Sequence, residues 1–127
     1  MRNFMMVLVL LGCSAAAVAA GKAFDQKSFE QAAQQGKPVL VMVHADWCPV
    51  CRAQARVVDR LAAQSEFSNY EVLRVDFDTQ DQVLQQFGVQ RQSVLIVFKG
   101  DMEVGRTLGD TREAGIATLM RKATAGH

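Results

Sequence analysis

The stretch that most restricts the fold is VLVMVHA, an unbroken and mostly apolar run at positions 39–45. Gly36 and Pro38 come just before it, and both residue types interrupt regular structure. A short valine-rich run bounded by such breakers is typical of a strand that is buried on both faces. Strands of that kind occur in parallel sheets covered by helices, so the run predicts an α/β domain.

Helix and strand patterns alternate along the rest of the chain. The first helix is expected between Asp25 and Gly36, which match the preferences for an N-cap and a C-cap. Further helices are expected at 49–64, 81–88 and 111–123, and further strands at 70–78, 93–100 and 102–109. Helices between strands imply right-handed crossovers within one sheet. Because the last two strands follow each other through a turn, we expect a central mixed sheet with helices on both faces.

Length and charge limit the possible functions. The chain has 127 residues, which suits one domain, and its formal net charge is +1. Such a small charge provides no basic field to attract nucleic acid, so we expect no nucleic-acid partner.

Residues 1–20 have the composition of an export signal. Arg2 is followed by an apolar run at 4–11 and then by small residues, the order found in secretory signals. Cleavage near the end of this segment would release a domain at 21–127. Alternatively, LLGC resembles a bacterial lipobox that would lipidate Cys13, or the segment could remain as an uncleaved anchor. All three alternatives place the domain outside the cytoplasm, in the bacterial periplasm, and only the last two attach it to a membrane.

Two cysteines, Cys48 and Cys51, follow the predicted buried strand in the sequence WCPVC. Pro49 suits the first turn of a helix, so Cys48 should lie at a helix N-terminus. Unpaired N–H groups and the helix dipole favour a thiolate there, and Cys51 is close enough to reach it. The arrangement suits reversible exchange, in which Cys48 attacks a partner's sulfur and Cys51 resolves the mixed disulfide.

The same cysteines allow other interpretations. In an oxidising compartment they could form a fixed structural disulfide, although so short a loop removes little unfolded-state entropy. Cys48, Cys51 and His44 could instead hold copper or an iron–sulfur cluster. A four-thiolate zinc site would need a dimer or other ligands, because the chain has no second C-x-x-C. A non-catalytic adaptor with a vestigial dithiol is a further alternative.

Over about residues 24–123 the chain resembles the thioredoxin family. The resemblance runs through PVLVMVHADWCPVCRAQ, LRVDFDTQ and FGVQRQSVLIVFKGDMEVGRTLG. It implies a thioredoxin-like fold lacking much of the usual first strand. It also implies an enzyme that exchanges disulfides with protein thiols, uses no organic cofactor and is recycled by a dithiol protein. Cys48 would be the exposed nucleophile and Cys51 the buried resolving thiol, with Trp47 packed beside them.

Three positions depart from the family pattern. Met42 stands where the family has a buried acid that assists proton transfer at the resolving thiol, and Met42 cannot titrate. Ser93 stands at the cis-proline position, and we expect a trans bond because a cis bond there costs about 2.5–4 kcal/mol. In the family this proline is thought to keep metal off the dithiol, so Ser93 favours the metal alternative. Arg56 lies near the place of a common proline kink.

Four residues near the cysteines are candidates for supporting roles. His44 could supply proton chemistry at the dithiol, or pack as an ordinary strand residue. Trp47 could contact a partner protein, and Ser93 could donate a hydrogen bond to the Cys48 thiolate. Arg52 places a positive charge directly after the two cysteines, which can favour a thiolate. The Pro-Val pair between the cysteines does not indicate the direction of electron flow.

Overall fold

The predicted buried strand lies in the middle of a five-stranded sheet. In the computed structural model, which describes residues 21–124, β2 (Pro38–His44) lies between β3 (Glu71–Asp76) and β4 (Val94–Lys99). β3 runs parallel to β2, and β4 runs antiparallel to it. Every residue of β2 is buried, which explains why the run has no alternating polar positions. The expected export signal, with Cys13, lies outside the described residues.

Two further strands form the edges of the sheet. β1 (Lys22–Ala23) pairs in parallel with β3, and β5 (Met102–Leu108) pairs in antiparallel with β4. The strand order is β1-β3-β2-β4-β5, which confirms the predicted mixed sheet. β1 has only two residues, in agreement with the implied loss of much of the first strand.

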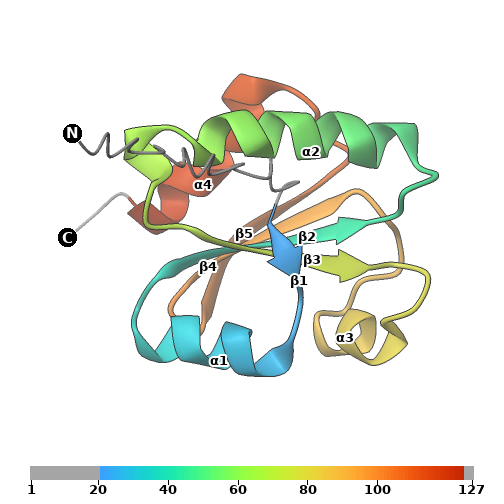
Figure 1. The fold of residues 1–127 in the computed structure, drawn as a ribbon, viewed down its shortest axis with the longest axis horizontal. Coiled ribbons are helices and arrows are strands. Elements are labelled where there is room, and N and C mark those ends of the chain that lie inside the picture. The colour runs from blue at the N-terminus through green and yellow to red at the C-terminus, as the bar shows by residue number, and fades with distance from the viewer. Residues whose placement is uncertain (1–20, 125–127) are drawn as a thin grey trace, which may run out of the picture.

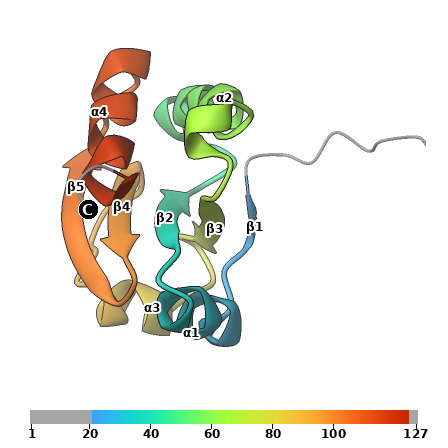
Figure 2. The ribbon, with the colours of Figure 1, turned by 90° about the vertical axis from the view of Figure 1, so that its left-hand side faces the viewer.

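Helices cover both faces of the sheet, as predicted (Figure 1). Figure 2 shows α2 (Pro49–Ala62) and α4 (Glu113–Thr124) on one side, with α1 (Gln26–Gln34) and α3 (Asp81–Gln86) on the other. A short 3₁₀ helix at Ser65–Phe67 follows α2. Within residues 21–124, no helix has the length and hydropathy needed to cross a bilayer.

Each face of β2 contributes to a separate core. Side chains alternate along a strand, so Leu40 and Met42 pack beneath α2 and α4, whereas the valines between and beside them point toward α1 and α3. The second core also contains the phenylalanines Phe24, Phe29, Phe87 and Phe98. Because both faces are filled, β2 holds the N-terminus of α2 in a fixed place at the end of the sheet.

Two leucines provide a matched test of this core. Leu95 is fully buried in β4, whereas Leu108 is 58% exposed at the end of β5. We predict that Leu95→Ala lowers the free energy of unfolding by about 2–5 kcal/mol, because it leaves a cavity. Leu108→Ala should change it by less than about 0.5 kcal/mol. Urea denaturation measures both values, and equal losses for the two variants would contradict the packing described here.

Candidate active site

Both cysteines lie at the N-terminus of α2, directly after β2. Cys48 is the N-cap residue, and its Sγ accepts a hydrogen bond of 3.2 Å from the backbone N–H of Cys51. Pro49 occupies the first turn, as predicted. Both cysteines are free thiols in this structure. The structure therefore confirms that the sequence places the two sulfurs together at a helix N-terminus.

The burial of Cys48 differs from the expectation. The resemblance implied an exposed nucleophile, but only 4% of Cys48 is exposed, compared with 1% of Cys51. As an N-cap, Cys48 turns its sulfur back toward the start of α2, and Ser93 approaches the same sulfur from the loop before β4. The prediction of an exposed Cys48 is therefore wrong, while that of a buried Cys51 is confirmed.

Ser93 contacts both sulfurs. Its Oγ lies 3.3 Å from Cys48 Sγ and 3.1 Å from Cys51 Sγ. The contact with Cys48 agrees with the hydrogen bond expected from the sequence, whereas the contact with Cys51 was not expected. The peptide bond before Ser93 is trans, as expected. The position that resembles the family's proline thus brings a hydroxyl group to the dithiol.

The backbone of Ser93 is left-handed, with a φ of +67°, and Ser93 is the one non-glycine residue with positive φ within residues 21–124. Such a conformation costs about 1–3 kcal/mol and persists only where neighbouring groups hold it. The N–H of Ser93 donates to the Val43 carbonyl at 3.0 Å, and its carbonyl accepts from the Gly109 N–H at 2.8 Å. Proline has no N–H and a fixed negative φ, so it could not adopt this geometry.

Gln54, which was not among the residues expected at the site, also holds the Ser93 loop. Its Nε2 donates to the carbonyls of Ser93 at 3.1 Å and Asp110 at 3.0 Å, and the residue is fully buried. Gln54 follows Cys51 by three positions and precedes Val58 by four, so it lies on the apolar stripe of α2. A glutamine in such a stripe is a signal that sequence reasoning could have used.

The two thiols have opposite pKa shifts. Burial alone would raise the pKa of Cys48, but hydrogen bonds from the Cys51 thiol and the Ser93 hydroxyl outweigh it, with help from backbone N–H groups. The pKa of Cys48 therefore lies below its ordinary value. Burial, together with the hydrogen bond to Cys48, raises the pKa of Cys51. The site thus favours a thiolate at Cys48 beside a protonated Cys51.

His44 lies at the end of β2 and is largely buried. Its Nε2 is 3.0 Å from Asp46 Oδ1, and its buried Nδ1 has no hydrogen-bond partner among the described residues. Neither ring nitrogen is hydrogen-bonded to Cys48 or Cys51. Within residues 21–124, no group of three or more His, Cys, Asp or Glu side chains is placed to hold a metal ion.

Trp47 and Arg52 lie at the rim of the site. Trp47 is 57% exposed, and its Nε1 donates to Asp78 Oδ2 at 2.9 Å, which fixes the orientation of the ring. The exposed Arg52 donates to the Asp46 carbonyl at 3.0 Å and so braces the turn before Cys48. Both residues adjoin the cysteines in sequence, and their expected roles, contact with a partner protein for Trp47 and support of a thiolate for Arg52, stay predictions.

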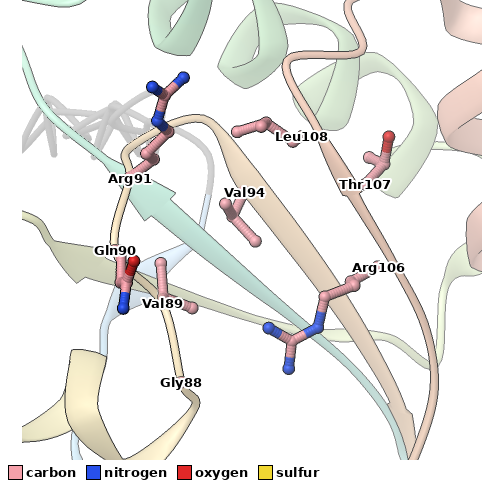
Figure 3. Close-up of a pocket in the computed structure, with 8 residues that line it drawn as sticks. All are labelled: Gly88, Val89, Gln90, Arg91, Val94, Arg106, Thr107 and Leu108. Carbon is pink, nitrogen blue, oxygen red and sulfur yellow. The ribbon is translucent and has the colours of Figure 1, made fainter.

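Two adjoining hollows extend from the Ser93 side of the site. The first, of about 460 Å³, is lined by Val50, Arg91, Gln92, Ser93, Leu108 and Gly109. The second, of about 430 Å³, shares Arg91 and Leu108 with the first and continues to Arg106. Figure 3 shows the apolar side chain of Val94 between these two arginines, with Leu108 nearby. Together they form a groove, partly apolar, that leads to the Ser93 loop.

The opposite pKa shifts predict how the two cysteines react with iodoacetamide. Because only the thiolate reacts, alkylation of Cys48 should persist below the ordinary thiol pKa of about 8.5 and fall as pH drops through its lowered pKa. Cys51→Ala removes a hydrogen bond to the thiolate, so it should raise the apparent pKa of Cys48. Mass spectrometry of peptides against pH measures both effects. Preferential alkylation of Cys51 would contradict this description.

Comparisons with known proteins agree with this geometry. The family model described as Thioredoxin matches residues 21–122. Thioredoxin 1 of Nostoc sp. is 33% identical over 104 residues, which cover 82% of this chain and 96% of that protein. Thioredoxin of Alicyclobacillus acidocaldarius is 35% identical over 98 residues, covering 74% of this chain and 92% of that protein. The crystal structure of Trxlp from Edwardsiella tarda has a TM-score of 0.76 and 41% identity, covering 78% of this chain and 96% of that chain. The chain therefore belongs to the thioredoxin family and is a protein thiol-disulfide oxidoreductase of the thioredoxin type.

Proposed function

We propose that this oxidoreductase works in the bacterial cell envelope, with Cys48 as its nucleophile and Cys51 as its resolving thiol. The observation that carries these roles is the position of Cys48 as the N-cap of α2, where its Sγ accepts the Cys51 N–H, and the opposite shifts of the two pKa values agree with it. A low pKa makes Cys48 a thiolate that can attack a disulfide. A raised pKa keeps Cys51 protonated, and therefore unreactive, until the first step has occurred.

The exchange takes place in two steps. The Cys48 thiolate attacks a partner's disulfide, one partner sulfur departs, and a mixed disulfide between Cys48 and the other partner sulfur remains. Cys51 then attacks Cys48 Sγ, the second partner sulfur departs, and the Cys48–Cys51 disulfide forms. The partner has gained two electrons and two protons. A second dithiol protein recycles the enzyme by reversing these steps, and the same chemistry can run in the oxidising direction.

Partner proteins have a suitable surface on which to dock. Trp47, Val50 and Leu108 are large apolar residues that are 57%, 40% and 58% exposed. Trp47 and Val50 flank Cys48 in sequence, and Leu108 lines the groove beside Ser93. Exposed apolar side chains around a reactive group favour contact with a protein substrate. The partner's disulfide would approach Cys48 between these side chains.

The sequence of residues 1–20 supports the location in the envelope. A basic residue, an apolar run and a small-residue segment follow one another in the order of an export signal. Outside the cytoplasm, cysteine pairs in client proteins are oxidised, so a thiol-disulfide oxidoreductase has substrates there. Lipidation at Cys13 or an uncleaved signal would attach the enzyme to the membrane.

Substitution of each cysteine tests the two roles. We predict that Cys48→Ser abolishes reduction of a protein disulfide such as that of insulin, because no nucleophile remains. Cys51→Ser should form a mixed disulfide with the substrate but fail to release it, so that a covalent complex accumulates on non-reducing gels. Each variant serves as the control for the other. If Cys48→Ser trapped substrate and Cys51→Ser did not, the roles would be reversed.

A fusion tests the location. Residues 1–20 are placed before a reporter phosphatase that gains activity only outside the cytoplasm, and expressed in a Gram-negative bacterium. We predict an active reporter, because the apolar run directs export. A matched fusion in which Leu8 and Leu10 are replaced by Asp should be inactive. Equal activity of both fusions, or inactivity of both, would contradict export through this segment.

A further inference from the structure

We propose that Ser93 is a catalytic residue, whose hydroxyl carries the proton of Cys51 during resolution of the mixed disulfide. The inference rests on the proposed exchange function and adds a proton path to its second step. That path has three members, Cys51, Ser93 and the sulfur that departs from Cys48. The observation behind it is that one hydroxyl oxygen lies within hydrogen-bond distance of both cysteine sulfurs.

Resolution needs a proton carrier because Cys51 is protonated and enclosed. Its side chain is 1% exposed, and burial raises its pKa, so bulk water has little access to its proton. Met42 is fully buried and has no proton to exchange. His44 directs Nε2 to Asp46, and its Nδ1 has no hydrogen-bond partner among the described residues. In the part of the chain that the structure describes, Ser93 is the hydroxyl that reaches the Cys51 thiol.

Hydrogen-bond chemistry assigns a direction to the path. A thiolate only accepts hydrogen bonds, so the Ser93 O–H donates to Cys48 Sγ when Cys48 is ionised. In the mixed disulfide Cys48 is no longer a thiolate, so the Cys51 S–H, which donates to Cys48 in the reduced site, is free to donate to the lone pairs of Ser93 Oγ. During resolution the path therefore runs from Cys51 to Ser93, and from Ser93 to the sulfur that departs from Cys48.

The resolving step balances with this path. Cys51 Sγ bonds to Cys48 Sγ, and the bond between Cys48 Sγ and the partner sulfur breaks, with its electron pair going to the partner sulfur. The Cys51 proton passes to Ser93 Oγ as the hydroxyl proton of Ser93 passes to the partner sulfur, which departs as a thiol. Ser93 is regenerated as a hydroxyl. The partner sulfur begins one disulfide bond, about 2.05 Å, from Cys48 Sγ, the atom that Ser93 already contacts.

The strained backbone of Ser93 places the hydroxyl for this role. Its positive φ is maintained by hydrogen bonds from its N–H to Val43 and to its carbonyl from Gly109 and Gln54. A conformation that is costly for serine persists at a reactive site, which points to a function of the side chain it presents. Gln54 acts as a positioning residue, because its buried amide N–H groups join the Ser93 and Asp110 carbonyls and are not hydrogen-bonded to Cys48 or Cys51.

The experiment measures resolution alone. The full-length protein is joined at Cys48 to a small aromatic thiol as a mixed disulfide, and release of that thiol is followed by stopped-flow absorbance against pH. We expect Ser93→Ala to slow release on the order of 10²-fold near neutral pH, the range of one lost acid–base group. The deficit should shrink as pH rises through the raised pKa of Cys51, because Cys51 then ionises without help.

Control variants separate the hydroxyl from the fold. Ser93→Gly also lacks the hydroxyl but accepts positive φ without strain, so it should fold at least as stably and resolve as slowly as Ser93→Ala. Ser68→Ala removes an exposed serine hydroxyl at the end of the 3₁₀ helix and should match the wild type. Gln54→Met should slow release less than Ser93→Ala, with the same recovery at high pH.

Two outcomes would overturn the inference. One is release by Ser93→Ala and Ser93→Gly at the wild-type rate near neutral pH. The other is a slower rate whose deficit is the same at every pH, which would indicate altered geometry instead of a lost proton path. Both are distinct from failure of the proposed function, in which the wild-type mixed disulfide would not resolve to a Cys48–Cys51 bond at all.

Discussion

The hydrogen bonds that join Ser93 to the two sulfurs are the interaction on which the chemistry of this site depends. The bond to Cys51 is 3.1 Å long, and the bond to Cys48, at 3.3 Å, helps to lower the pKa of Cys48 against the effect of its burial. Without such donors, a thiol that is 4% exposed would stay protonated at neutral pH and would be a poor nucleophile. The buried dithiol can therefore remain reactive, because the Ser93 hydroxyl and backbone N–H groups donate the hydrogen bonds that water would donate to an exposed thiolate.

The fold accounts for where that hydroxyl lies. β2 and β4 pair in antiparallel, and the hydrogen bond from the Ser93 N–H to the Val43 carbonyl extends this pairing by one residue beyond β4. The same strand β2 leads directly to the turn that ends in Cys48. The turn before Cys48 and the loop that holds Ser93, which are distant in sequence, are thus held together at one end of the sheet. Gln54 of α2 holds the Ser93 loop from the helix side. A residue with a backbone N–H at position 93 fits this arrangement, whereas a proline does not.

Much of this could be predicted from the sequence where the signal is local. The apolar run of β2, the N-cap at Asp25 and the place of Cys48 before Pro49 follow from patterns within a few residues, and the structure confirms them. The two-residue strand β1 has no pattern long enough to detect. The burial of Cys48 and the double contact of Ser93 depend on a loop 42 to 45 residues away, so no local pattern indicates them. Gln54 is only partly predictable, because its position on the apolar stripe of α2 can be read from the sequence but its hydrogen-bond partners cannot.

The central claim is that Cys48 and Cys51 form a reversible redox pair, and the reduction potential tests it most directly. The protein is equilibrated with glutathione buffers of graded composition in the presence of a metal chelator, and the fraction of Cys48–Cys51 disulfide is measured by mass spectrometry after acid quenching. The account predicts one reversible two-electron transition with a midpoint between about −270 and −120 mV, the range of known protein dithiols of this kind. Failure of the disulfide to form, or a disulfide that no buffer reduces, would contradict it.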